Sequence, residues 1–230
     1  MNCIFMSLIP FDRKNKVMVA SNMQYRKIPH FSKEEIQMIF EYLTNKVNST
    51  NGQMKRHYQT YYLLTKMLYR TGARIEEILG GYKTHRDPIT HKIEKQQVSG
   101  IRPKDIDLKH NSIYIVTLKH KKLEYRELAI HNDLRDALMS YYLDYNISQD
   151  STEPLFSIKR AAYDRFLKKM GKELGFHINA HKFRHTTAVR LSEAGVSISR
   201  IQKILGHSNA FITSVYLQTL DYKDDILKME

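Results

Sequence analysis

The sequence predicts a mostly α-helical domain that carries a small antiparallel β-sheet. Apolar residues recur at helical spacing through most of the chain. Residues 113–118 are instead rich in the β-branched and aromatic residues that strands favour, and residues 125–130 are a plausible partner strand. Hydrophobic residues make up 42% of the 230 residues, which is enough for a sizeable core.

The first half of the chain divides into an arm, three helices and an insertion. Residues 1–30 show no sustained periodicity and are interpreted as an N-terminal arm or linker, and residues 31–230 as one domain. Ser32 and Glu35 have the spacing of a capping box, so a helix begins there. A second helix is expected over residues 55–70, ended by Gly72, and a short one over 74–79. Residues 80–100 are basic, polar and without clear period, and we expect an exposed insertion.

The second half begins with the sheet and ends in helices. Residues 113–118 and 125–130 would pair as a hairpin whose tip is formed by residues 119–122. Helices are expected over residues 132–145 and 157–174. Gly195 and Gly206 then divide residues 180–219 into three short helices.

Charge and cysteine content limit the possible partners. The 37 Lys and Arg residues exceed the 24 acidic residues and give a net charge of +13, which indicates a polyanionic partner. Nucleic acid is favoured over a membrane because the basic residues are spread through patterned globular sequence. Cys3, the single cysteine, allows neither an internal disulfide nor a thiolate zinc site. The apolar run over residues 3–11 is too short for a membrane span, and we expect a cytoplasmic protein.

Five residues together suit chemistry on a phosphodiester. The reaction requires cations on the nonbridging oxygens, for which Arg74 and Arg184 are the candidates. His181 and His207 would bind the phosphate or move a proton, and Tyr216 would attack phosphorus. With the tyrosine as nucleophile and these cationic side chains on the phosphate, we expect no metal. The phosphotyrosine ester retains the energy of the broken strand, so rejoining needs no nucleotide cofactor.

Each of these residues also has an ordinary interpretation. His181 and Arg184 would form a solvated basic patch, and Tyr216 is one of fifteen tyrosines. His207 would merely start a helix, and Arg74 would bind a structural carboxylate such as Glu77. Their joint order and spacing favour the catalytic interpretation.

In that order and spacing the chain resembles the tyrosine recombinases, which include the phage integrases and the Xer proteins. The matching segments are residues 71–79 (TGARIEEIL), 181–186 (HKFRHT) and 205–208 (LGHS), followed by Tyr216. The resemblance covers residues 30–220 and implies the catalytic-domain fold of that family. It further implies site-specific recombination of double-stranded DNA through a 3′-phosphotyrosine, with four protomers acting on two duplexes.

The resemblance also assigns roles to individual residues. Arg74 and Arg184 would clamp the scissile phosphate, while His181 and His207 would assist proton transfer and Tyr216 would form the covalent link. Glu77 would support the site from behind these residues. A lysine on the hairpin tip would act as general acid. Lys119 is our choice there, with Lys121 and Lys122 as the alternatives.

Two departures from the family pattern bear on the domain organisation. The insertion over residues 80–100 stands where relatives pass quickly to the first strand. Only about thirty residues precede the catalytic domain, so we expect no complete N-terminal core-binding domain. The chain would then be a fragment, a short recombinase or one that depends on a partner.

Three other functions are compatible with parts of this sequence. His181 and His185 lie four residues apart and could ligate zinc, but Lys182 stands where the metalloprotease pattern requires Glu. A catalytically silent DNA-binding regulator would not need every expected catalytic residue type. A type IB topoisomerase-like nicking and rejoining enzyme uses related chemistry and is the nearest enzymatic alternative.

Overall fold

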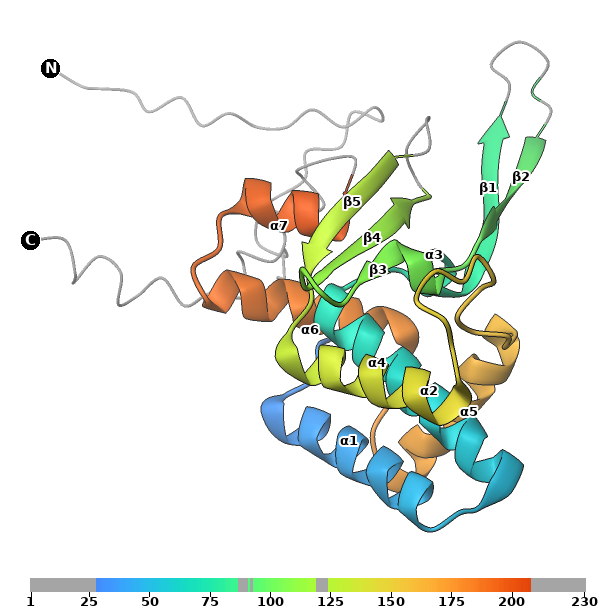
Figure 1. Ribbon diagram of the computed structural model, residues 1–230. Coiled ribbons are helices and arrows are strands. Elements are labelled where there is room, and N and C mark those ends of the chain that lie inside the picture. Colours follow the sequence, from blue (N-terminus) through green and yellow to red (C-terminus); the bar gives the residue numbers. More distant parts are fainter. Residues whose placement is uncertain (1–27, 87–90, 92, 119–123, 208–230) are drawn as a thin grey trace, which may run out of the picture.

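The computed structural model describes residues 28–86, 91, 93–118 and 124–207. Over these ranges the chain forms seven α-helices and two small antiparallel sheets (Figure 1). Most of the helices lie together in one layer, with the three-stranded sheet packed at one end of that layer and the two-stranded sheet projecting beside it (Figure 1). The predicted fold class, mostly helical with a small antiparallel sheet, is confirmed.

The first two helices begin and end at the predicted local signals. Helix α1 spans Lys33–Asn48 and starts with the expected capping box, in which the Glu35 backbone N–H donates to Ser32 Oγ at 3.1 Å. Helix α2 spans Gly52–Thr71, three residues longer at its start than predicted. Gly72 ends α2 with a φ of 62°, a conformation that glycine adopts without strain.

Helix α3 and the segment after it differ in how well the sequence predicted them. Helix α3 spans Ile75–Leu79 and begins one residue later than predicted, because Arg74 is its N-cap. Strands β1 (Gly80–Arg86) and β2 (Ile93–Ser99) then form an antiparallel hairpin, where the sequence predicts only an exposed insertion without clear period. Tyr82 and Ile93 on this hairpin are both more than 60% exposed. Strands show an alternation of apolar and polar residues when one face of the sheet is buried. This hairpin exposes large apolar side chains, so its sequence lacks that pattern and its strands were not predicted.

The second sheet matches the predicted hairpin closely. Its strands are β3 (Ile106–Asp107), β4 (Ser112–Thr117) and β5 (Glu124–Ala129), in the order β3-β4-β5. Ile113 pairs with Leu128 and Ile115 with Arg126, so these four residues share the face that packs on the core. The predicted hairpin tip, residues 119–122, lies outside the described residues.

Four helices complete the described fold. They are α4 (Asn132–Tyr145), α5 (Arg160–Leu174), α6 (Ala180–Glu193) and α7 (Ile198–Leu205). Helix α4 coincides with the prediction, and α5 begins three residues later than predicted. The 3₁₀ turn η2 spans Pro103–Asp105. The third helix predicted in the region of residues 180–219 falls outside the described residues.

The core is built around α2 and places the end of α7. Helix α2 packs against α1, α4 and α6, and its Leu64, Met67 and Leu68 are completely buried. A smaller apolar cluster joins α6 to α7, and it includes Val189 and Leu205. Because this cluster fixes α7 on α6, it also fixes the turn that follows α7. None of the described helices is both long and apolar enough to cross a membrane.

Candidate active site

Arg184 is a buried link between the ends of two helices. It lies in the second turn of α6 and is only 1% exposed. Its Nη1 donates to the Gly72 carbonyl, and its Nη2 donates to the Leu205 carbonyl, both at 2.7 Å. Asn179 caps α6 by accepting the Lys182 backbone N–H at 2.8 Å, which fixes where the helix starts. The guanidinium therefore joins the end of α2 to the end of α7.

Arg74 and Glu77 form a tight pair at the start of α3. The Arg74 backbone N–H donates to Glu77 Oε2 at 2.9 Å, and its guanidinium Nη1 donates to Glu77 Oε1 at 2.8 Å. Both guanidinium Nη atoms of Arg74 also lie 3.5 Å from the Gly206 carbonyl oxygen. Glu77 is 1% exposed, so the pair has a fixed geometry with little access to water.

Arg126, on β5, is a member of the site that sequence reasoning missed. Its Nη2 donates to Glu77 Oε2 at 2.6 Å. Burial by itself would raise the pKa of Glu77, but the charges and hydrogen bonds of Arg126 and Arg74 outweigh burial and hold that pKa below its ordinary value. One signal was present in the sequence. Arg126 alternates with the inward-facing Leu128, and an inward-facing arginine in a strand requires an acceptor.

Three arginines meet at the carboxyl end of α7. The carbonyl of Ile204 accepts from Arg126 at 2.9 Å, that of Leu205 from Arg184 and that of Gly206 from Arg74. The last carbonyls of a helix lack partners within the helix and form its negative end, which explains why cationic side chains gather there.

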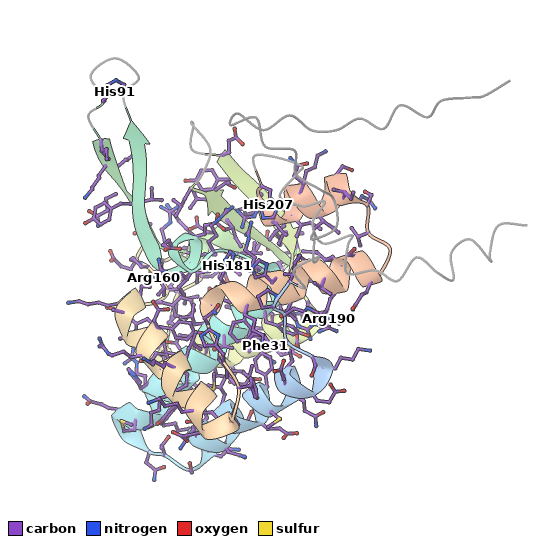
Figure 2. All side chains as sticks on the ribbon, turned by 180° about the vertical axis from the view of Figure 1, so that it is seen from behind. Phe31, His91, Arg160, His181, Arg190 and His207 are labelled. Carbon is purple, nitrogen blue, oxygen red and sulfur yellow. The ribbon has the colours of Figure 1, made fainter. Side chains whose placement is uncertain are left out.

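His207 is the residue directly after this turn. Its side chain is 7% exposed, and its backbone N–H donates to the Gln202 carbonyl at 3.0 Å. Gly206 has a φ of 65° and turns the chain out of α7. A hollow of about 420 Å³ opens beside this turn and is lined in part by Thr117, Arg126, Gly206 and His207. Figure 2 marks His207 just beyond α7 and His181 at the start of α6.

His181 and His185 lie one turn apart on α6. Their rings meet edge to face with centroids 4.3 Å apart, and His181 is the exposed member of the pair. Burial, with the nearby His181 and Arg184, lowers the pKa of His185 to about 4. His185 is therefore neutral at neutral pH, whereas His181 faces solvent one turn before Arg184.

The structure therefore brings together Arg74, Glu77, Arg184 and His207 at the end of α7, and it places His181 on the helix that carries Arg184. The remaining predicted site residues fall outside the described ranges. These are the proposed nucleophile and the three candidate lysines: Tyr216, Lys119, Lys121 and Lys122.

Known proteins resemble this chain both in sequence and in fold. The chain is 25% identical to the tyrosine recombinase XerA of Saccharolobus solfataricus over 203 residues, covering 87% of this chain and 59% of the relative. It is 31% identical to the tyrosine recombinase XerC of Chlamydia pneumoniae over 160 residues, covering 67% of this chain and 46% of the relative. The chain thus spans about half to three fifths of the length of these relatives.

A solved structure gives the same fold. The Tn1549 transposon integrase, in complex with transposon right end DNA, superposes with a TM-score of 0.60 at 16% identity. The superposition covers 92% of this chain and 67% of the integrase. Residues 95–222, more than half of this chain, match the phage integrase family. The chain belongs to the phage integrase family.

Proposed function

We propose that this chain is the catalytic domain of a tyrosine site-specific recombinase of the integrase type. It would cleave and rejoin strands of double-stranded DNA through a covalent 3′-phosphotyrosine, without metal or nucleotide cofactor. The observation that carries the proposal is the convergence of Arg74 and Arg184 on the last turn of α7, directly before His207. The two arginines are 110 residues apart in the chain, and membership of the phage integrase family supports the same assignment.

The arginines would neutralise the phosphate in this reaction. A phosphodiester resists attack because it is anionic, and charge accumulates on its nonbridging oxygens in the transition state. Arg74 is held by Glu77 and Arg184 by two backbone carbonyls, so both guanidinium groups are held in place before charge develops. Arg184 would have to share its donors between these carbonyls and the phosphate.

The bond changes would be assigned as follows. The Tyr216 oxygen would attack phosphorus and lose its proton, while the bond from phosphorus to the 5′-oxygen breaks. His181 and His207 would bind the phosphate or accept the tyrosine proton. Lys119 would protonate the departing 5′-oxygen, with Lys121 and Lys122 as alternatives. Rejoining reverses these steps, with the 5′-hydroxyl attacking the phosphotyrosine.

Double-stranded DNA would be the substrate and partner. The net charge of +13 favours a polyanion, and the Tn1549 transposon integrase has been solved in complex with DNA. A homotetramer on DNA and a cytoplasmic location belong to the same proposal. Residues 31–230 would form the catalytic domain, preceded by an arm over residues 1–30.

A covalent capture experiment tests the proposal. The chain is incubated in chelator with a pool of nicked duplexes whose central base pairs are randomised. The nick lets the short cleaved end diffuse away, so the adduct accumulates, and the random base pairs sample possible sites. Denaturing gels separate covalent protein–DNA adducts, and sequencing of the captured DNA identifies the cleaved site. The proposal predicts an adduct with Tyr216 bonded to a 3′-phosphate. Duplex binding without any adduct would overturn it in favour of a silent DNA-binding regulator.

The same material separates a recombinase from a topoisomerase of type IB. Exchange of strands between two duplexes that carry the captured site is expected of a recombinase. Relaxation of supercoiled plasmids that lack this site, with no exchange, would identify a topoisomerase instead.

A further inference from the structure

We propose that Arg126 is a positioning residue that aligns Arg74 through Glu77 and fixes the turn that carries His207. This inference rests on the function proposed above, because it gives Arg126 a part in presenting that site to a phosphodiester. Arg126 would not touch the substrate. Its action would pass through the groups to which it is hydrogen-bonded.

The guanidinium of Arg126 contacts a different element with each of its three nitrogens. Nε donates to the Ile204 carbonyl of α7 at 2.9 Å. Nη1 donates to Thr117 Oγ1 at the end of β4 at 3.0 Å. Nη2 donates to Glu77 Oε2 on α3 at 2.6 Å. Its side chain is 9% exposed, so these partners replace water almost completely.

Glu77 transmits the position of Arg126 to Arg74. Its Oε2 accepts from Arg126 and from the Arg74 backbone N–H, while its Oε1 accepts from the Arg74 guanidinium. The carboxylate is planar, so fixing Oε2 also fixes the direction in which Oε1 holds Arg74. With its side chain fully buried, Glu77 has no water to compensate for a lost partner. Without Arg126, both the carboxylate and the Arg74 guanidinium would gain freedom.

Arg126 also fixes the turn after α7. A methyl group added at Gly206 would lie 3.0 Å from Arg126 Nη1 and 3.1 Å from Thr117 Oγ1, which shows how closely this turn packs on the guanidinium. His207 is the next residue. Arg126 thus contacts both Glu77, which holds Arg74, and the turn that carries His207. The position of His207 relative to Arg74 therefore depends on this one side chain.

A lysine could not replace Arg126 in this role. The guanidinium is a planar fork with five N–H donors in fixed directions, whereas a lysine carries its donors on a single nitrogen. A single ammonium would retain the charge beside Glu77 but could not reach Ile204 and Thr117 in the same geometry. The structure thus predicts that charge alone does not restore the function of Arg126.

The test compares Arg126→Gln and Arg126→Lys with the milder Thr117→Val, which removes one of the three acceptors. Arg70→Gln is the control. Arg70 also forms a partly buried ion pair, in which its Nη2 lies 2.7 Å from Oδ2 of Asp133 on α4, but it contacts neither Glu77 nor Arg74 in the hydrogen bonds described above. The first readout needs no DNA and no activity. NMR of the ¹⁵N-labelled chain measures how fast the Arg74 guanidinium rotates, and thermal unfolding confirms that each variant is folded.

The inference predicts faster rotation of the Arg74 guanidinium in both Arg126 variants, a smaller change in Thr117→Val and none in Arg70→Gln. Unchanged rotation in a folded Arg126 variant would overturn the inference. If both Arg126 variants unfold, unchanged rotation in Thr117→Val would overturn it instead. This readout stays decisive even if the wild-type chain forms no adduct, an outcome that would refute only the proposed function.

The second readout is the single-turnover rate of adduct formation on the captured duplex at saturating protein, with the Kd measured separately. A misplacement of about 1 Å remote from the chemistry can cost about a hundredfold in rate. We expect a loss of that order in Arg126→Gln, at least a tenfold loss in Arg126→Lys, and a Kd within about threefold of wild type. In the Arg74→Lys background, Arg126→Gln should cost less than it does in the wild-type background, because only its effect through the turn that carries His207 remains. Full multiplication of the two losses, or a loss confined to Kd, would overturn the inference.

Discussion

Replacing Glu77 by glutamine should remove the negative charge that holds two arginines together. The side chain keeps its size, so packing in the core changes little. Its amide retains one oxygen that can accept a hydrogen bond, but its NH₂ group would face a guanidinium. Arg74 and Arg126 would then be left as neighbouring cations, with side chains only 14% and 9% exposed.

The loss in the free energy of unfolding depends on the hydrogen-bond partners that each arginine retains. Removing one partner of a buried ion pair costs about 3–5 kcal/mol when the other charge is left uncompensated. Arg126 retains the Ile204 carbonyl and Thr117, and Arg74 retains some access to water and a long contact with Gly206. We therefore expect Glu77→Gln to lower the free energy of unfolding by about 2–4 kcal/mol at pH 7.

The dependence on pH has a definite sign. The folded pKa of Glu77 lies below its ordinary value of 4.5, so its stabilising effect is complete above pH 4.5 and is lost as the pH falls through the folded pKa. The difference between wild type and Glu77→Gln should thus be largest at neutral pH and shrink in acid. Urea unfolding followed by circular dichroism measures both quantities. Glu127→Gln is the control, because Glu127 is exposed on β5 and should change stability by less than about 0.5 kcal/mol. A loss below about 1 kcal/mol at pH 7, or a difference that grows in acid, would show that Glu77 does not hold the two arginines in this way.

Three further predictions concern the same region. Gly206→Ala and Gly195→Ala both force alanine into a left-handed conformation, with φ of 65° and 74°, but only Gly206 has neighbours within 4 Å of the added methyl group. Gly195→Ala should cost about 1 kcal/mol and Gly206→Ala at least about twice as much; thermal unfolding that ranks them in the opposite order would be inconsistent with the packing described. His185 should titrate near pH 4 in ring NMR spectra because it is half-buried beside His181 and Arg184, so stability should fall as the pH drops from about 6.5 to 4; a midpoint near 6.5 would argue against this environment. Arg184→Lys cannot reach the Gly72 and Leu205 carbonyls with one nitrogen, so adduct formation should slow by about 10²–10³-fold in single-turnover assays; a rate near that of wild type would remove Arg184 from the site.

Local signals in the sequence were enough to predict most of the helices. The capping box at Ser32 and the glycines at positions 72 and 206 each act within a few residues, so their effect can be judged without the fold. The β1–β2 hairpin was not predicted, because its strands lack a local signal of this kind. Its Tyr82 and Ile93 are exposed, so the burial that produces an alternating pattern is missing.

The sequence shows which residue types the site contains and how they are spaced. It does not show which of those residues contact one another. Arg74, Arg184 and His207 could be selected as candidates by their types and spacing. For Arg126 the sequence offered only the signal of an inward-facing arginine in a strand, because its acceptors on Glu77 and Ile204 lie 49 and 78 residues away in the chain. Only the fold brings those atoms within hydrogen-bonding distance.

Mass spectrometry of the adduct identifies the residue that attacks the DNA. The wild-type chain, Tyr216→Phe and Tyr222→Phe are incubated with the captured duplex in chelator, digested and sequenced as peptides. Loss of one phenolic oxygen should leave duplex binding near normal. We expect a nucleotide bonded to Tyr216 in wild type and in Tyr222→Phe, with no adduct in Tyr216→Phe. An adduct that persists in Tyr216→Phe, or that maps to another residue, would contradict this expectation.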